Sequence, residues 1–350
     1  MTKDTTDAIG AVLRTFVIGL GRAGAGLHIP ILTRIRETAT ANGAPILACD
    51  PATGEGDLPP GVVAVRSIEQ AARSLDPADT VTHLCTPPGS RSALLDELAA
   101  AGFRRFVLEK PIATNDRDLR RIMRLRARHD LRFVVVAPWL AAALTGRLAS
   151  IVRDGTLGAL RAITVHQHKP RFHRSLATYG HPTAFDVEIP HAIPVVLRLA
   201  GPAELVDASW RTLSCDERDI PRLGGARLTL AHRGGARSEL VSDLTSPTRE
   251  RRIRLEFAEG TVTADYPVGE DDDHAQLTVT TGDRSEHRAF RDDALTAFFI
   301  GAYRRLGKPA DDTEDLDFAL HRETVRLLSE AKSRCATIPV QSRSEPQYAR

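Results

Sequence analysis

Cysteines and long apolar runs are both scarce in this sequence of 350 residues. Its four cysteines lie far apart and form no Cys-x-x-Cys pair, which argues against a zinc ribbon or a disulfide framework. The apolar stretch near 131–144 is interrupted by Arg132 and Pro138 and is too short to span a bilayer. The first residues lack a charged segment followed by an apolar one, so we expect no signal peptide.

An excess of charge of one sign is also missing. The 47 lysines and arginines against 45 acidic residues leave a formal net charge of +2. This balance gives no broad field to hold nucleic acid or an anionic membrane, so we expect neither as a partner. Hydrophobic residues make up 42% of the chain, which excludes a disordered protein. The sequence therefore predicts a cytoplasmic globular protein, and its length predicts about two domains.

The first part of the chain alternates strand-like and helix-like segments. Strands are expected at 14–19, 45–50, 62–65, 80–85, 105–109 and 132–137, and helices at 25–41, 67–74, 90–101 and 115–129. Several of these strands are apolar on both faces, which is typical of a parallel sheet covered by helices. The pattern predicts a doubly wound α/β domain of the Rossmann type over residues 1–137.

The second part, residues 138–338, has a different pattern. Short glycine, aspartate and proline turns separate strands expected at 159–168, 203–214, 225–232, 237–245, 251–257, 260–265, 276–281 and 285–290. Helices are expected at 141–154, 185–200, 291–306 and 315–333. Consecutive strands with short turns predict an α+β domain with an antiparallel or mixed sheet. The acidic run at 270–273 is expected to be a hairpin turn, and the polar residues 339–350 a mobile tail.

A glycine-rich loop follows the first expected strand and opens the first expected helix. Its pattern is Gly19-x-Gly21-x-x-Gly24, with Arg22 and Ala23 completing it. In a dinucleotide-binding loop the first glycine permits a tight turn, the second lets the backbone approach the pyrophosphate, and the third allows close helix–strand packing. The alternative is a turn of purely structural use, which the flanking strand and helix make less favoured.

An acidic residue, Asp50, ends the second expected strand. A carboxylate there accepts hydrogen bonds from the adenine ribose hydroxyls and repels a 2′-phosphate. The next residues, Pro51, Ala52 and Thr53, include no arginine that would bind such a phosphate. The sequence therefore favours NAD(H) over NADP(H).

Lys110 is one of only five lysines in the chain. It follows the strand expected at 105–109, and open α/β sheets bind ligands at the carboxyl ends of their strands. Pro111 restricts the backbone beside it. This placement alone fits a ligand-binding residue and a surface charge equally well.

Several motifs in order resemble one known family. GLGRAG with His28 behind it, CTPPGSRSALLDELAAAGFRRFVLEKPIA, DGTLGAL and ALHRETVRLLSEAKS resemble the Gfo/Idh/MocA oxidoreductases, the group of glucose–fructose oxidoreductase and inositol dehydrogenase. The resemblance covers residues 12–338. It implies a Rossmann domain, a second domain with a large open sheet, a nicotinamide cofactor, a sugar, cyclitol or related polyol as substrate, and a homodimer or homotetramer.

The resemblance also assigns roles to residues. In the family the lysine of the Glu-Lys-Pro motif, here Lys110, touches the reacting hydroxyl and the nicotinamide. His191, in the segment 183–201, matches a second catalytic position, and either Asp186 or Glu188 matches the carboxylate that accompanies it. The residues expected to line the cofactor groove at strand ends are Thr86, Pro87, Glu109 and Lys110.

These residue types suit alcohol oxidation. A histidine has an ordinary pKa of about 6.5, which suits reversible proton transfer at neutral pH. A lysine cation beside the oxygen stabilises developing alkoxide, and a carboxylate orients the imidazole or binds a neighbouring hydroxyl. We therefore expect Lys110 and His191 to carry the chemistry, with Asp186 third and Glu188 its competitor.

The segment 164–181 is rich in cations and histidines. We expect Lys169, Arg171 and His173 to form a basic rim that binds the substrate, with His168 as a further substrate-binding candidate. A solvated surface fits the segment equally well. His166 and His168 share one strand face, but no cysteine or clear carboxylate completes a ligand set with His173 or His181, so no metal is expected.

Three positions depart from the family pattern: Arg91, Ala192 and Pro194. We expect these changes to reshape the substrate pocket. The favoured reading is an NAD-dependent oxidoreductase that interconverts a secondary hydroxyl and a ketone on a polyol, a chemistry compatible with secondary metabolism. One alternative is internal redox cycling with tightly bound NAD, giving epimerisation or elimination. Another is a non-catalytic NAD-binding sensor, to which the three departures would point.

Overall fold

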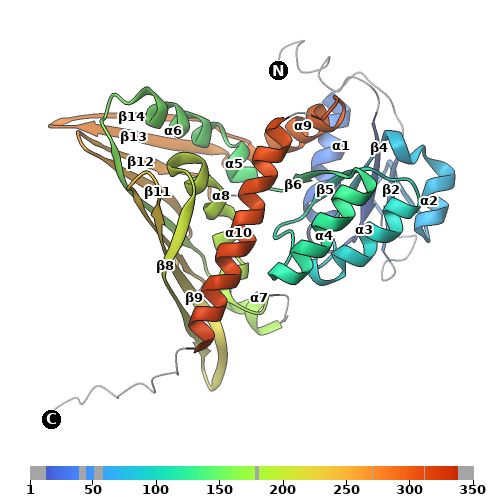
Figure 1. Ribbon diagram of the computed structural model, residues 1–350, viewed down its shortest axis with the longest axis horizontal. Coiled ribbons are helices and arrows are strands. Elements are labelled where there is room, and N and C mark those ends of the chain that lie inside the picture. The colour runs from blue at the N-terminus through green and yellow to red at the C-terminus, as the bar shows by residue number, and fades with distance from the viewer. Residues whose placement is uncertain are drawn as a thin grey trace.

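The computed structural model describes residues 13–38, 45–50, 58–177, 181–269, 271–310 and 312–337. Two sheets lie on either side of a long C-terminal helix (Figure 1). The expected tail at 339–350 and the residues that follow Asp50 lie outside the described ranges. Among the described helices, none is both long enough and apolar enough to cross a bilayer.

The first sheet has six strands, all parallel, in the order β3-β2-β1-β4-β5-β6. The strands are β1 Arg14–Ile18, β2 Ile46–Cys49, β3 Val62–Ala64, β4 Thr80–Leu84, β5 Arg105–Leu108 and β6 Arg132–Val135. This is the strand order of a doubly wound dinucleotide-binding domain, whose ligands bind where the order reverses, next to β1 and β4. The expected fold class of this half is confirmed.

The helices of this domain begin at residues that cap them. They are α1 Ile29–Thr38, α2 Ile68–Ser74, α3 Arg91–Ala100 and α4 Asp116–His129, and a π-helical turn, Gly24–His28, precedes α1. The Ser67 side chain accepts the backbone N–H of Gln70 at the start of α2, and the Asn115 side chain accepts that of Asp118 at the start of α4. In α4 a buried stripe of leucine and isoleucine packs on the sheet.

The second sheet has eight strands in the order β14-β13-β12-β11-β7-β10-β9-β8. The strands are β7 Leu160–His168, β8 Ala203–Cys215, β9 Arg218–His232, β10 Arg237–Asp243, β11 Glu250–Phe257, β12 Thr261–Asp265, β13 His274–Thr281 and β14 Arg284–Arg291. Every neighbouring pair is antiparallel except β7 and β10. The large, mostly antiparallel sheet is therefore confirmed.

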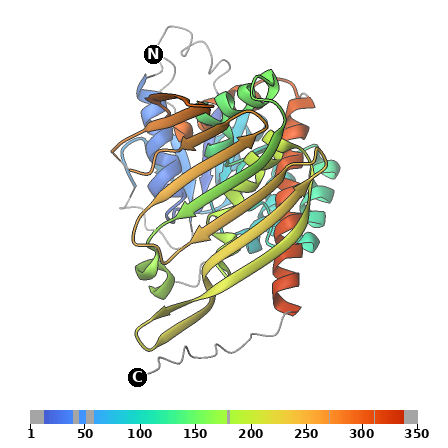
Figure 2. The ribbon, with the colours of Figure 1, turned by 90° about the vertical axis from the view of Figure 1, so that its left-hand side faces the viewer.

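One face of this sheet carries the core of the second domain, and we call it the inner face. Side chains such as Ile163, Val165 and Leu240 on the strands pack there against Ile193 and Val196 of α8 Ile189–Ala200. The remaining helices of this half are α5 Pro138–Ala141, α6 Ala143–Asp154 and α7 Phe172–Ala177, the last of which the sequence did not predict. Helices leave the opposite, outer face uncovered (Figure 2).

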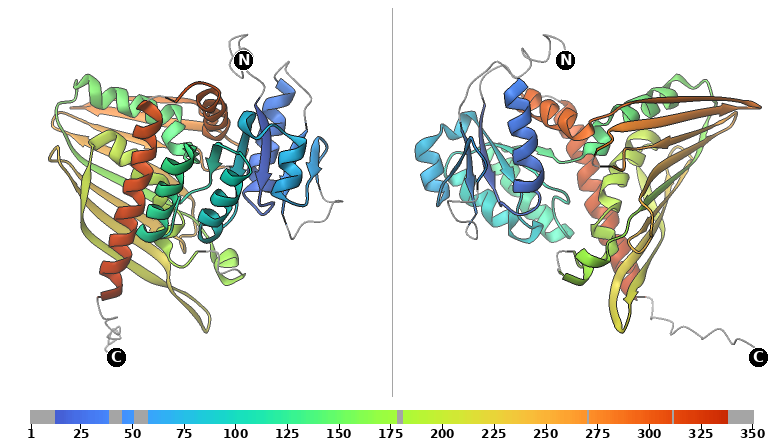
Figure 3. Two further views of the ribbon diagram at one scale, coloured as in Figure 1. Left: turned by 45° about the vertical axis from the view of Figure 1, so that its right-hand side comes forward. Right: turned by 180° about the vertical axis from the view of Figure 1, so that it is seen from behind.

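Two C-terminal helices connect the sheets. In α9 Ala294–Leu306 the side chains of Phe299 and Tyr303 are buried with Val17 and Ile29 of the first domain. The long helix α10 Asp312–Thr337 packs on β8 and α8 of one half and on β6 and α4 of the other (Figure 3). Because both helices contact the first domain, the boundary expected near residue 137 stays a prediction.

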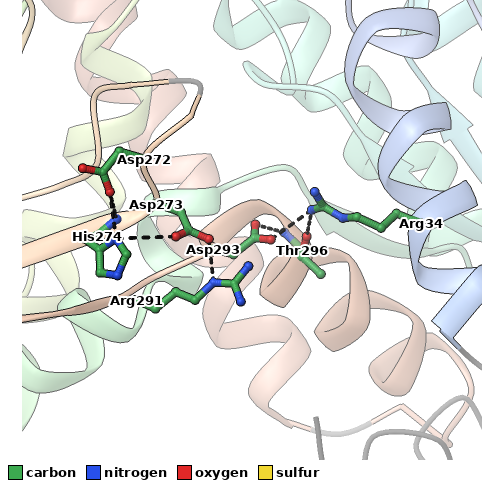
Figure 4. A network of polar contacts seen from close by, with 7 residues as sticks. All are labelled: Arg34, Asp272, Asp273, His274, Arg291, Asp293 and Thr296. Carbon is green, nitrogen blue, oxygen red and sulfur yellow. Dashed lines mark hydrogen bonds and ion pairs between the residues drawn. The ribbon is translucent and has the colours of Figure 1, made fainter.

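Polar contacts at the start of α9 reach both halves (Figure 4). The Asp293 side chain accepts the backbone N–H of Thr296 and a hydrogen bond from Arg34 of α1, at 3.1 and 2.9 Å. Nearby, Arg291 Nε donates to Asp273 at 2.7 Å. The acidic run that includes Asp273 joins the antiparallel strands β12 and β13, as the sequence predicts, residue 270 lying outside the described part.

Candidate functional site

The glycine loop after β1 has the shape that a dinucleotide requires. Gly19 adopts a φ of 91°, and a Cβ there would lie 3.0 Å from the backbone of Cys85. A Cβ on Gly24 would lie 1.9 Å from the carbonyl oxygen of Gly19, so only glycine allows this helix–strand packing. A Cβ on Gly21 would meet nothing within 4 Å, which leaves room for a phosphate to approach the backbone. The loop therefore fits a bound pyrophosphate.

Asp50 lies at the edge of the same loop. Its Oδ2 accepts the backbone N–H of Leu20 at 2.6 Å. This contact holds a carboxylate at the carboxyl end of β2, where an adenine ribose is bound in such domains. Arg22 and Ala23 follow in the loop, Arg22 being exposed and Ala23 half-buried.

Arg91 holds two neighbouring loops together. Its fully buried guanidinium donates to the carbonyl oxygens of Thr86 at 3.2 Å, of Ile112 at 3.0 Å, and of Pro111. Burial lowers its pKa to about 10, at which it is still a cation at neutral pH. The expectation that Arg91 reshapes a substrate pocket stays a prediction; the structure shows that its guanidinium connects the backbone of Thr86 with that of Pro111 and Ile112, next to Lys110.

Lys110 joins the first sheet to the second domain. Its Nζ donates to the carbonyl oxygen of Val187 at 3.0 Å. Val187 immediately precedes Glu188, the residue that caps α8. The charge of Lys110 acts on both Glu188 and His191. The structure thus brings Lys110, Glu188 and His191 together, as the sequence predicts for a polyol site.

Glu188 is a buried carboxylate among cations. Burial opposes its ionisation, but the charges of Lys169, of His191 in its protonated form and of Lys110 outweigh that cost and hold the pKa of Glu188 at about 2. Lys169 forms an ion pair with its Oε1. At neutral pH Glu188 is therefore an anion that can only accept hydrogen bonds.

His191 sits one helical turn beyond Glu188. Burial, followed by the charge of Lys110, lowers its pKa to about 3, so the ring is neutral at pH 7. Its Nδ1 is buried and has no hydrogen-bond partner among the described residues. Trp139 of α5 stacks near the ring at a centroid distance of 6.5 Å. An unpaired ring nitrogen beside Lys110 is a natural contact for a substrate hydroxyl.

Asp186 has other partners. It lies in a 3₁₀ turn, Ala184–Asp186, where its Oδ2 accepts from the Thr183 backbone N–H and hydroxyl at 3.2 and 2.7 Å. Its Oδ1 forms an ion pair with Lys332 of α10. Both carboxylate oxygens are therefore used in fixing the segment before α8, and Glu188 is the carboxylate that faces Lys110 and His191.

The expected basic rim is only partly assembled. Arg171 is buried, its Nη1 donates to the Ser175 hydroxyl at 3.0 Å, and the charges of Glu188 and Arg22 act on its pKa. His173 is exposed on α7 and forms no hydrogen bond or ion pair within the described part of the chain. His168 points to the outer face of the second sheet, because successive strand residues alternate and Gln167 takes the inner face. The structure does not bring His168 to the site.

On the outer face His168 meets His166 and Glu250. One ligand atom from each lies within 4.8 Å of the others. Glu250 of β11 is the carboxylate that the sequence did not reveal, since it is 82 positions from His168 and meets it only through strand pairing. However, His168 Nδ1 already accepts the Asp243 N–H at 3.2 Å, and Arg252 lies 3.2 Å from Glu250.

A series of buried polar side chains, joined by hydrogen bonds, ends at Glu109, the residue before Lys110. His28 Nε2 donates to Glu109 Oε1 at 2.9 Å, and His28 Nδ1 lies 2.9 Å from His83 Nδ1. His83 Nε2 lies 3.0 Å from the Tyr303 hydroxyl, which lies 2.6 Å from the Thr15 hydroxyl. Burial opposes ionisation of Glu109, but His28, Lys110 and His191 outweigh it and lower its pKa. Sequence reasoning missed this series, apart from Glu109 itself.

His181 is another residue that the sequence did not place in the site. Burial and then the charges of Lys110 and Arg171 lower its pKa to about 4. The one sequence feature that could have placed His181 in the site is its position shortly before α8. The residues 178–180 that precede it lie outside the described ranges.

Comparisons with known proteins identify the fold. No family model matches the chain, and no curated protein matches it. Among solved structures, KijD10, a 3-ketoreductase from Actinomadura kijaniata in complex with NADP and TDP-benzene, is 15% identical with a TM-score of 0.73, covering 92% of this chain and 97% of that one. An NAD-binding oxidoreductase from Klebsiella pneumoniae is 14% identical with a TM-score of 0.73, covering 93% and 97%. This chain therefore shares the fold of these two oxidoreductases over nearly its whole length.

Proposed function

We propose that this protein is an NAD(P)-dependent oxidoreductase that interconverts a secondary hydroxyl and a ketone on a sugar-like polyol. The observation that carries the proposal is the meeting of Lys110 with the segment before α8. Lys110 Nζ contacts Val187 at 3.0 Å, and this contact sets a cation from the dinucleotide-binding sheet beside Glu188 and His191 of the second domain. The fold shared with nicotinamide-dependent oxidoreductases supports the same reading.

The cofactor-binding residues in this proposal are those of the glycine loop and the strand ends. Gly19, Gly21 and Gly24 would hold the pyrophosphate, and Asp50 the adenine ribose. When bound, the nicotinamide supplies or accepts the hydride. Asp50 favours NAD over NADP by repelling a 2′-phosphate. Because KijD10 was crystallised with NADP, both cofactors belong in the test.

The protein's own groups handle the oxygen and its proton. Lys110 Nζ would donate to the substrate oxygen and stabilise negative charge that develops there. His191 is neutral at pH 7, so its unpaired Nδ1 can accept the hydrogen of a substrate hydroxyl. Glu188, ionised and held by Lys169, would accept from a neighbouring hydroxyl. This arrangement fits a polyol, because it offers acceptors for more than one hydroxyl.

The test follows NADH and NADPH absorbance with purified protein and a panel of sugars, inositols and aminocyclitols, in both directions. We expect a substrate-dependent change with at least one polyol. Turnover that is detected chromatographically without net change in NADH would instead indicate internal redox cycling, and bound cofactor with no turnover on any member would indicate a sensor. Either of those results would contradict the proposed function.

A further inference from the structure

A row of polar side chains crosses the inner face of the second sheet beside Glu188. Ser242 of β10 pairs with Gln167 of β7, and Gln167 pairs with Arg251 of β11. Alternation along β7 puts Gln167 on the same face as the core residues Ile163 and Val165. Arg251 shares this face, because it pairs directly with Gln167 and lies two positions before the buried Ile253 along β11. The row therefore forms a floor under the proposed site.

The middle of this row lacks hydrogen-bond partners. Gln167 is 1% exposed, yet neither its amide nitrogen nor its amide oxygen is bonded to any described group. Ser242 is also 1% exposed, and its hydroxyl likewise has no hydrogen-bond partner among the described residues. Buried polar groups are nearly always hydrogen-bonded, and unpaired ones destabilise a fold. Two in adjacent register positions indicate that something other than the chain pairs with them.

The charge around the row is unbalanced. Four cations, Lys110, Lys169, Arg171 and Arg251, act on the carboxylate of Glu188, and of these Lys110 also acts on the carboxylate of Glu109. Lys169 is the one that forms the ion pair with it. Arg251 donates Nη1 to the Pro267 carbonyl oxygen at 2.7 Å, but within the described ranges neither Arg251 nor Arg171 forms an ion pair with a carboxylate.

Buried guanidinium groups normally have anionic partners. Arg171 is buried and Arg251 half-buried, and burial lowers the pKa of both, because a charge withdrawn from water is unfavourable unless it is paired. The charge of Arg22 in the glycine loop acts on Arg171, so a cofactor phosphate bound at that loop would also act on Arg171, with the opposite sign. Arg251 lies on the sheet, paired with Gln167, and the carboxylate that acts on it is that of Glu188, which already forms an ion pair with Lys169.

We infer that the substrate is an acidic polyol, and that Arg251 binds its carboxylate or phosphate while Gln167 and Ser242 bind the adjoining oxygens. A guanidinium presents paired N–H donors that match either anion. The amide and hydroxyl supply neutral partners on one side of it. This inference rests on the proposed function, because it names the substrate class of the same site.

The test is binding, measured by calorimetry on protein saturated with NADH and, in parallel, with NADPH. The probes are matched sets: glucose, glucuronate and glucose 6-phosphate; galactose and galacturonate; myo-inositol and its 1-phosphate. At least one acidic member should bind at least tenfold more tightly than its neutral parent. The uronates and phosphates separately report which anion is recognised. Neutral parents that bind as tightly as every acidic member would overturn the inference.

Two variants assign the effect to the row. Arg251→Gln should abolish the acid preference, whereas Arg252→Gln, on the outer face of the same strand and paired with Asp265, should retain it. Preference that survives Arg251→Gln contradicts the inference. Gln167→Leu provides a second check that is independent of Arg251. It should raise the melting temperature of the ligand-free protein, because it removes an unpaired buried amide, and weaken acid binding threefold or more.

A role for Gln167 in folding alone would give the opposite change in melting temperature and no change in binding. The inference and the proposed function fail separately. Acid preference without cofactor turnover on any member would leave the anion site in place and contradict the oxidoreductase. Turnover on neutral polyols without acid preference would support the oxidoreductase and contradict the anion site.

Discussion

The Nζ atom of Lys110 lies 3.0 Å from the carbonyl oxygen of Val187, so the end of a Rossmann strand contacts the start of a helix in the second domain. That one contact sets the position of the candidate site. It places a lysine cation of the sheet whose glycine loop fits a dinucleotide beside the pair Glu188 and His191. Substitutions on either side of it therefore test different parts of the account.

Arg91→Met should destabilise the protein strongly. The substitution leaves the carbonyl oxygens of Thr86, Pro111 and Ile112 without their donor in a buried place. We expect a loss of about 3 kcal/mol in the free energy of unfolding, as for several unpaired buried groups. Urea unfolding measures it, and Arg124→Met, at an exposed position of α4, is the control. Equal stability of the two variants would show that the guanidinium does not hold these loops.

Asp50→Asn should change cofactor preference. The variant keeps the shape of the side chain and removes the charge that favours ribose hydroxyls and repels a 2′-phosphate. We expect the ratio of the dissociation constants of NADP and NAD to fall about tenfold, a change of roughly 1.4 kcal/mol. Titration of protein fluorescence with both cofactors measures the ratio. Asp96→Asn, on the exposed side of α3, should leave it unchanged; a ratio that is equally unchanged in Asp50→Asn would contradict the ribose contact.

Acid should destabilise the fold through buried histidines. Burial lowers the pKa of His321 in α10 from 6.5 to about 4. Between these values the unfolded chain binds a proton that the folded protein does not, so stability falls as pH is lowered from 6.5 to 4. His321→Gln should reduce this slope by up to one proton, about 1.4 kcal/mol per pH unit.

Urea unfolding at several pH values measures the slope for wild type and variant. His173→Gln is the matched control, because that histidine is exposed. His191 and Glu188, with pKa values of about 3 and 2, act in the same direction and extend the acid sensitivity downward. A slope identical in wild type and His321→Gln would show that this histidine is not buried as a neutral ring.

Tyr303→Phe should alter the hydrogen bonding of His83, which belongs to the series of buried polar side chains that ends at Glu109. Arg36 donates to the Thr15 hydroxyl at 2.8 Å, and a carboxylate at the other end only accepts. Each group in between then donates toward Glu109, so His83 carries its proton on Nδ1. Removing the Tyr303 hydroxyl leaves His83 Nε2 unpaired and should cost about 1–2 kcal/mol. Imidazole ¹⁵N shifts measure the protonation, and a wild-type His83 protonated on Nε2 would contradict this direction.

Helices and strands with a clear pattern of apolar residues were predictable from the sequence. All six strands of the first sheet lie within the ranges that their apolar runs indicate, and the glycine loop, Asp50 and Lys110 follow from local patterns. Helix α7 was missed because its residues, Phe172–Ala177, are mixed polar and carry no apolar period. Strand β9 begins at Arg218 rather than at 225 because its first residues pair only locally, in a hairpin with the end of β8.

Contacts between distant segments decide what the sequence left open. Spacing alone did not choose between Asp186 and Glu188; Lys332, 146 positions from Asp186, takes that carboxylate. Alternation implied that Gln167 and His168 face opposite ways, but which of them faces inward depends on the helices that cover the sheet. Arg91 departs from the family pattern in residue type, and only the folded loops reveal its carbonyl partners.

The most direct test of the central claim compares Lys110→Ala with Lys308→Ala, an exposed lysine beyond α9. Turnover is followed by nicotinamide absorbance on the polyol that the wild type uses best, and cofactor binding is measured on the same samples. The account predicts that Lys110→Ala lowers kcat by a factor of about 10² to 10⁴ while it still binds cofactor, and that Lys308→Ala equals the wild type. Undiminished turnover in Lys110→Ala would contradict it.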